Sequence, residues 1–196
     1  MPSYTFATGV SPSAATLNAN LRDQVTTSCT SASRPTGTAG QIIFETDTGR
    51  YMVYTGSVWL ELARISGSQT YTPQLDQGAT TNIAKTGTPR FIQHGNETIV
   101  WGTLAVTAAG TAGSPVTVSL PVTPSGYSAN DQIGYGHIID ASAGANSSFC
   151  SAWFNGSAGV IFQIDSTAAA GRWGQAPSIA LASGDSIRYS LSYLTA

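Results

Sequence analysis

The stretch that decides the fold of the first part of the chain is GQIIFETDTGRYMVYTGSVW, residues 40–59. It alternates short runs of β-branched and aromatic residues with two turn signals. In the first turn, Gly49 can adopt the positive φ that closes a three-residue hairpin, and a Gly-Ser pair at 56–57 makes the second. The pattern therefore predicts a three-stranded meander, with strands at 41–46, 51–55 and 58–63.

This meander is expected to be too small to fold by itself, because a segment below about forty residues rarely buries enough apolar surface. Both of its faces carry bulky side chains, which compete for burial. Packing between identical copies is the simplest way to bury both faces. The predicted oligomerisation residues of the meander are Ile42, Phe44, Tyr51, Val53 and Trp59.

The segment before the meander, SPSAATLNANLRDQV at residues 11–25, has the one convincing helical pattern of the chain. Its apolar stripe of Leu17, Leu21 and Val25 is only one residue wide, which is typical of a seam against neighbouring copies or of a docking surface. The alternative is a helix that lies on the later domain of its own chain. We expect residues 1–33 to form an attachment helix with a linker, and residues 34–65 to form an oligomerisation segment.

Two segments, ATGVSPSAATLNANLRDQV and RPTGTAGQIIFETDTGRYMVYTGSVWLELA, together resemble the N-terminal part of fibre-like and minor tail proteins of tailed bacteriophages, especially those that infect actinobacteria. The resemblance covers about the first third of the chain. It implies an architectural role and assigns no matching position to catalysis. The matching positions are Leu17, Asn18, Leu21, Arg22, Asp23, Pro35, Gly40, Asp47, Thr48, Gly49, Gly56 and Trp59.

The C-terminal two thirds show a series of strands separated by Gly, Ser, Pro and Ala loops, at a spacing typical of a β-sandwich. We expect a linker at 66–79 and a sandwich at 80–196. The last strand, 187–194, places Ile187, Tyr189, Leu191 and Tyr193 on one side. This ending resembles the jelly rolls of trimeric fibre heads and of tumour-necrosis-factor-like domains. The expected fold class is mainly β: a short helix and meander stalk followed by a jelly-roll-like sandwich, assembled as a trimer.

Composition disfavours several functional classes. Charged residues make up 9% of the chain, against roughly a quarter in an average soluble protein, and the net charge is −2. With Lys85 as its single lysine, the chain has no basic stripe for nucleic acid. No apolar run is long enough for membrane insertion. Cys29 and Cys150 match no metal or disulfide spacing and are expected to be free thiols, so neither a metal nor a cofactor is predicted.

Aromatic and amide residues near loops are the best binding candidates, because an indole beside amides can stack on a sugar ring. The predicted receptor-binding residues are Trp153, Asn155, Arg172 and Trp173. The alternative is that Trp153 fills the core and Trp173 fixes a loop. His137 has no partner at ligand spacing, which favours a buried or inter-subunit histidine, and the scattered carboxylates fit turns, so no catalytic residue is predicted.

These features predict a non-enzymatic structural protein of a tailed-phage virion, assembled in the host cytoplasm. It would be a homotrimeric tail fibre or minor tail protein that contacts other virion proteins through its N-terminus. Its sandwich would bind a host-surface glycan through three weak sites acting together. The alternatives are a capsid-decorating head fibre and, from another class, a glycan hydrolase with paired carboxylates.

Overall fold

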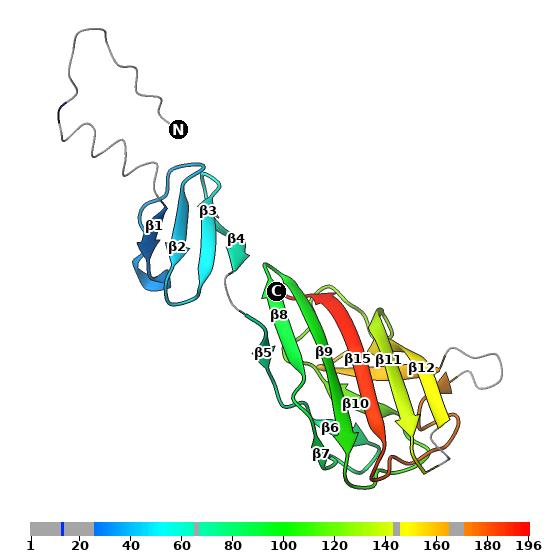
Figure 1. Cartoon of the computed structure of the whole chain (residues 1–196). Helices are drawn as coiled ribbons and strands as arrows, with labels where there is room; N and C mark the ends of the chain where they lie inside the picture. The colour runs from blue at the N-terminus through cyan, green and yellow to red at the C-terminus, as the bar shows by residue number, and fades with distance from the viewer. Residues whose placement is uncertain (1–12, 14–25, 65–66, 143–145, 165–170) are drawn as a thin grey trace. The chain divides into compact units, whose positions relative to one another are not determined.

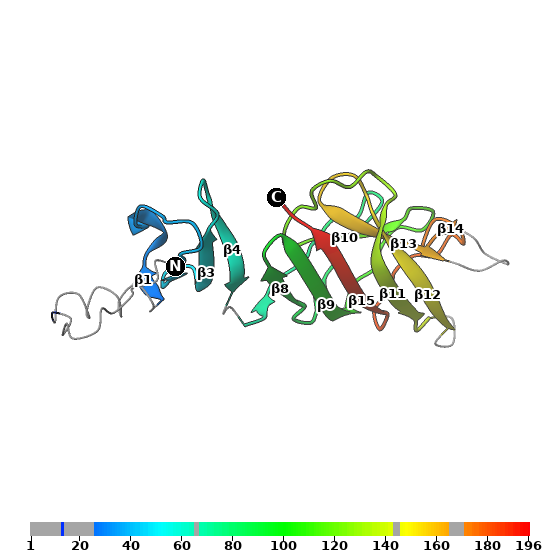
Figure 2. The same ribbon diagram turned by 90° about the horizontal axis from the view of Figure 1, so that it is seen from above.

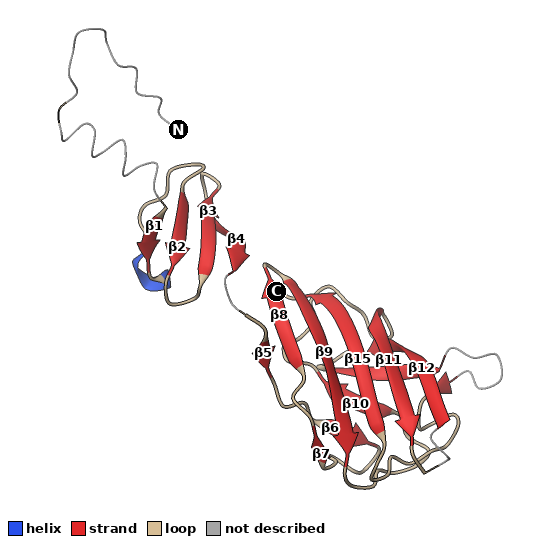
Figure 3. Cartoon of the chain, viewed as in Figure 1, coloured by secondary structure: helices blue, strands red, loops and turns tan. Residues whose placement is uncertain are grey.

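The computed structural model describes residues 13, 26–64, 67–142, 146–164 and 171–196 (Figure 1). It confirms a mainly β protein, since strands dominate these residues and their one helical element is a 3₁₀ turn, η1 (Ser31–Ser33) (Figure 3). The chain divides into two compact units, residues 1–66 and 67–196. The expected helix at 11–25, with Leu17, Leu21 and Val25, lies outside the described residues.

The first unit contains a four-stranded sheet in the order β1-β2-β3-β4. Its strands are β1 (Thr27–Cys29), β2 (Ile42–Glu45), β3 (Arg50–Tyr54) and β4 (Trp59–Arg64). The antiparallel pairing of β2 with β3 and of β3 with β4 confirms the predicted meander. Gly49 and Gly56 close its turns with φ values of 66° and 105°, a region that glycine enters without steric cost.

The segment before the meander differs from the expected linker, because residues 27–29 pair in the first sheet and residues 31–33 form η1 beside it. β1 pairs in parallel with β2, and the amide of Thr46 donates to the carbonyl of Cys29 at 2.9 Å. The Asp47 carboxylate accepts hydrogen bonds from the amide and hydroxyl of Ser31, at 2.9 and 2.6 Å. Arg34 forms an ion pair with the buried carboxylate of Glu45. These contacts hold the segment against the first hairpin.

The two faces of the meander differ in burial. Ile43 and Met52 are its only described apolar residues that are almost fully buried. The opposite face, called here the open meander face, is formed by Ile42, Phe44, Tyr51, Val53 and Leu60, all partly or largely exposed. Trp59 does not share this face with the other predicted oligomerisation residues. Strand alternation places it on the Ile43 side, where its ring centroid lies 5.2 Å from that of Tyr54.

The second unit is built on one continuous sheet in the order β5-β8-β9-β15-β11-β12-β13-β10-β6, with β7 and β14 paired at its sides. The sheet curls, so that β13 and β10 lie behind β9, β15 and β11 (Figures 1 and 2). The strands are β5 (Gln69–Thr70), β6 (Leu75–Gln77), β7 (Lys85–Thr86), β8 (Arg90–His94), β9 (Glu97–Val106), β10 (Val116–Ser119), β11 (Gln132–Asp140), β12 (Asn146–Phe154), β13 (Gly159–Ile164), β14 (Gly171–Arg172) and β15 (Ser186–Leu194).

A single hydrophobic core fills the inside of this curled sheet. On β15 the predicted alternation is confirmed, since its inward residues are at most 5% exposed and its outward residues are polar apart from Leu194. The hydroxyls of Tyr71 and Tyr189 satisfy each other in the core at 2.8 Å. The buried residues of β15 are Ile187, Tyr189, Leu191 and Tyr193.

The expected linker at 66–79 is wrong for its greater part, because from Gly67 onward it belongs to the second unit and supplies β5 and β6. Leu75 and Gln77 are fully buried. The Gln77 side chain donates to the carbonyls of Ser114 and Ile179, at 3.2 and 2.7 Å, and accepts from the amide of Leu181 at 2.8 Å. A buried glutamine that satisfies three backbone groups is part of the core.

Candidate functional site

The structure does not assemble the four predicted receptor-binding residues into one open site. Trp173 is 1% exposed, and its backbone bonds to both Phe162 and Val116, so it fills the core between β13 and β10 and cannot stack on a ligand. Asn155 instead stabilises a turn, because its side-chain oxygen accepts from Ser157 and Gly159.

Trp153 and Arg172 do share the outer face of the sheet. Trp153 lies opposite Ile161 on β13, and Arg172 lies opposite Gln163 on the same strand. Trp153 is only half-exposed, and its indole Nε1 is buried without a hydrogen bond to any described residue. Arg172 donates to the side chain of Asn130 at 2.9 Å. Both residues are therefore largely engaged with their own surroundings.

The most exposed aromatic side chains of the second unit lie nearby, on β11 and β12. Tyr135 is 68% exposed and Phe149 is 77% exposed. Residues directly opposite in paired strands share a face of the sheet. The register places Phe149, His137 and Arg188 in one row across β12, β11 and β15, and Tyr135 and Trp101 in the next row on either side of Ser190. We call Trp101, Tyr135, His137, Phe149 and Arg188 the aromatic face.

The rings of this face are held in place by their neighbours. Phe149 stacks on His137, with ring centroids 4.4 Å apart and planes 15° apart. The high exposure of Phe149 means that its other ring face is open to solvent. The Nε2 of His137 is buried beneath and makes no hydrogen bond within the described part of the chain. The result is a flat, pre-formed stacking surface.

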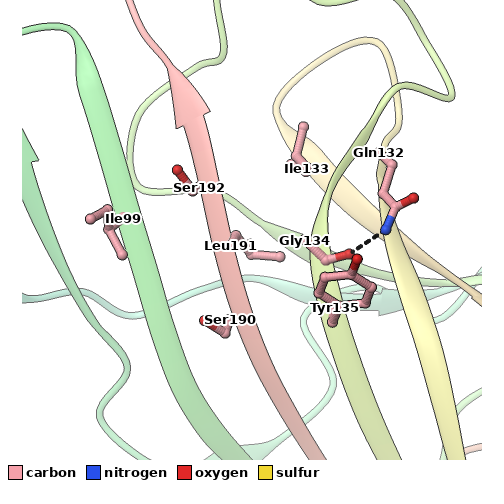
Figure 4. Close-up of a pocket in the computed structure, with 8 residues that line it drawn as sticks. All are labelled: Ile99, Gln132, Ile133, Gly134, Tyr135, Ser190, Leu191 and Ser192. Carbon is pink, nitrogen blue, oxygen red and sulfur yellow. Dashed lines mark hydrogen bonds between the residues drawn. The ribbon is translucent and has the colours of Figure 1, made fainter.

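A hollow of about 490 Å³ adjoins Tyr135 (Figure 4). It lies where β11 carries a bulge between Gln132 and Gly134 and where β15 presents serine side chains. Gln132, whose amide donates to the Gly134 carbonyl at 3.4 Å, offers its side chain at the rim. The hollow is lined by Ile99, Gln132, Ile133, Gly134, Tyr135, Ser190, Leu191 and Ser192.

The sequence did not reveal the aromatic face, because simple alternation along β11 would put Ile133, Tyr135, His137 and Ile139 on one strand face. The bulge breaks that alternation, so Ile133 is buried while Tyr135 points outward. The signal was the pair Gly134 and Gly136. Glycines facing inward leave room for a neighbour, here the ring of Phe162 against Gly136, and so place the large residues between them outside.

The carboxylates of the second unit serve mainly as turn acceptors. Asp185 accepts from the amides of Ala141 and Ala182, at 2.9 and 2.8 Å, and Asp131 accepts from the amide of Ser128 at 2.7 Å. Within the described ranges, no three His, Cys, Asp or Glu residues are grouped as a metal site requires. Nor does any helix among these residues have the length and apolar character needed to cross a membrane.

The aromatic face and its hollow thus combine flat rings, amide and hydroxyl groups and one guanidinium. This is a combination suited to a ring-shaped polar ligand. Comparison of the chain with family models, with curated proteins and with solved structures finds no match.

Proposed function

We propose that the chain is a structural virion protein of a tailed phage: a homotrimeric tail fibre or minor tail protein whose second unit binds a host-surface glycan. The resemblance of the first third of the sequence supports the virion role. The observation that carries the binding role is the aromatic face, where the highly exposed ring of Tyr135 lines a hollow together with an amide and two serine hydroxyls. The exposed ring of Phe149 lies in the neighbouring row of the same face. In this proposal, the curled sheet of the second unit has the role that a jelly-roll head has in such fibres.

The first unit is assigned to trimerisation and attachment. Among the described residues of this unit, the apolar side chains that are almost fully buried are Ile43 and Met52, whereas the open meander face leaves Ile42 at 40% and Leu60 at 52% exposure. A unit of this size usually needs further burial to be stable, and identical copies can supply it. Residues 1–25, which contain the helix expected from the sequence, complete the attachment segment in this proposal.

The second unit is assigned to weak, repeated recognition. A pyranose ring can stack on Tyr135 or Phe149 while its hydroxyls bond to Gln132, Ser190 or Ser192. One such contact is modest. Three copies held together raise the effective concentration of each site, so overall affinity exceeds that of one site by orders of magnitude.

The test is binding of the full-length protein to purified cell-wall polysaccharide of its host. The double variant Tyr135→Ala/Phe149→Ala should weaken binding by about tenfold or more, because each stacking contact contributes roughly 0.5 to 1.5 kcal/mol. Leu194→Ala is the matched control, since Leu194 is 47% exposed at the far end of β15. Unchanged binding by the double variant would rule out the aromatic face as the receptor site.

The virion role is tested separately by labelling the protein on intact particles and imaging them by electron microscopy. Label at the tail tip or along tail fibres is the expected result. Label on the capsid would replace the proposed tail location with a head-fibre location, and unlabelled particles would contradict the virion role.

A further inference from the structure

We infer that the glycan bound by the aromatic face is acidic, and that Arg188 holds its carboxylate or phosphate group. This inference rests on the proposed glycan-binding function and specifies its ligand. It follows from the positions of the charged residues in the second unit. Stacking on the exposed rings does not by itself distinguish an acidic glycan from a neutral one.

Arg188 lies in the middle of the aromatic face. It is an exposed residue of β15, directly opposite His137 on β11 and Thr103 on β9. Tyr135 and Trp101 are its diagonal neighbours, one on each side, and diagonal pairs are within reach of long side chains. A guanidinium among exposed rings can donate two parallel hydrogen bonds to an anionic group while the rings contact the sugar.

Arg188 is free of a carboxylate partner within the described part of the chain. The ion pairs formed between described residues all lie in the first unit. On the outer face of β9 and β15 the acidic residue is Glu97, which accepts from the Ser192 hydroxyl at 2.9 Å. Glu97 lies opposite Leu194, which is six residues further along β15 than Arg188. At the ordinary rise of a strand, this separation is about 20 Å. At physiological salt that separation is screened.

The same charges disfavour another occupant of this face, a second copy of the chain. An isologous contact would bring two Arg188 side chains, and two Arg90 side chains from the neighbouring strand β8, onto one interface. An apolar partner would bury the Arg188 guanidinium without compensation, which is costly. An anionic glycan supplies the missing charge and leaves the rings a flat surface to contact.

The experiment compares two probes of equal length, oligogalacturonate and a neutral maltooligosaccharide, with the full-length protein by isothermal titration calorimetry. The wild type should bind oligogalacturonate about tenfold or more tightly, as expected for a charge-assisted hydrogen bond. Arg188→Gln should remove this preference, so that the two probes bind with similar affinity. Arg188→Lys should retain part of the preference for oligogalacturonate. Added salt should weaken the binding of oligogalacturonate by the wild type but not its binding of the maltooligosaccharide.

Arg90→Gln is the matched control. Arg90 lies opposite Trp101 on β8, but its guanidinium donates to the carbonyl of Ser68 at 3.5 Å, so its loss should leave the preference intact. Equal binding of both probes by the wild type, or an Arg188→Gln variant that keeps the preference, would overturn the inference but not the glycan-binding proposal. Binding of neither probe, nor of host polysaccharide, would overturn both. Self-association of the second unit through Arg188 would also overturn the inference.

Discussion

Gly136 is a residue on which the packing of β11 against β13 depends. A Cβ atom added there would lie 2.5 Å from the ring of Phe162, far inside contact distance. We therefore expect Gly136→Ala to destabilise the protein by about 1 to 3 kcal/mol, the usual cost of overpacking a core. Urea unfolding measures this. Gly67→Ala is the control, because nothing lies within 4 Å of a Cβ atom at Gly67, and equal stability losses in the two variants would contradict the packing argument.

At the scale of single residues, the sequence predicted which residues lie in strands better than it predicted which face of the sheet each side chain occupies. On β15 strict alternation revealed the inward face. On β11 the bulge breaks simple alternation, because a one-residue insertion moves every later side chain to the other face. The bulge itself arises in the pairing of β11 with β12.

Glu45 makes the first unit sensitive to acid. Burial alone raises the pKa of Glu45, but hydrogen bonds from Arg34 and Thr48 outweigh burial and hold that pKa below its ordinary value of 4.5. The pKa of Asp47 is lowered likewise, chiefly by the Ser31 hydroxyl. A carboxylate with a lowered folded-state pKa contributes stability above its unfolded pKa and loses it as pH falls through the folded value. The first unit should therefore be unaffected between pH 7 and pH 5 and should loosen below about pH 4.5.

The ¹⁹F resonance of 5-fluorotryptophan at Trp59 follows this transition in the full-length protein. Thr48→Val removes one donor to Glu45 and should move the acid transition to higher pH, because the folded-state pKa of Glu45 then rises. Thr36→Val, at an exposed threonine outside this network, should leave the transition in place. If Thr48→Val leaves it in place too, the Thr48 hydrogen bond does not control the acid response.

At the scale of elements, β6 joins two distant loops through Gln77. Gly110 and Gly174 both lie so close to the Gln77 side chain that neither could carry a Cβ atom. Gln77→Leu would leave the carbonyls of Ser114 and Ile179 and the amide of Leu181 without this partner. We expect a loss of about 2 kcal/mol or more in urea unfolding. Gln74→Leu, three residues earlier and exposed, should cost far less, and a comparable cost would mean that Gln77 is not a core residue.

Strands bounded by glycine turns were predictable because turn chemistry is local. β2, β3, β4 and β15 lie within a residue or two of their expected bounds. Residues 66–79 were expected to be a linker. The burial within residues 67–79 follows from partners far away in the sequence, since β6 pairs with β10 and β5 with β8. Part of the aromatic face was missed for the same reason, because β9 and β11 are brought together only by their pairing with the distant strand β15.

At the scale of the whole molecule, the second unit has a core entirely of its own, formed by residues between Tyr71 and Tyr193. We therefore expect a fragment of residues 67–196 to fold and to be monomeric, whereas the full-length chain should be a trimer at micromolar concentration. Light scattering measures both masses, and circular dichroism checks the fragment. A monomeric full-length chain would refute trimerisation, and a trimeric fragment would place the trimer contact in the second unit. A fragment of residues 80–196 should fail to fold, because it lacks β6.

The parallel pairing of β1 with β2 has a mechanical consequence. β1, β2 and β4 run in the same direction and β3 runs against them, so the chain enters the sheet at the start of one edge strand and leaves at the end of the other. Tension between these ends acts along the strands, nearly perpendicular to the hydrogen bonds between antiparallel neighbours. The bonds of each ladder are then loaded together in shear rather than opened one after another. If the first sheet is anchored at one end and pulled from the other, the short ladder between β1 and β2 should break first.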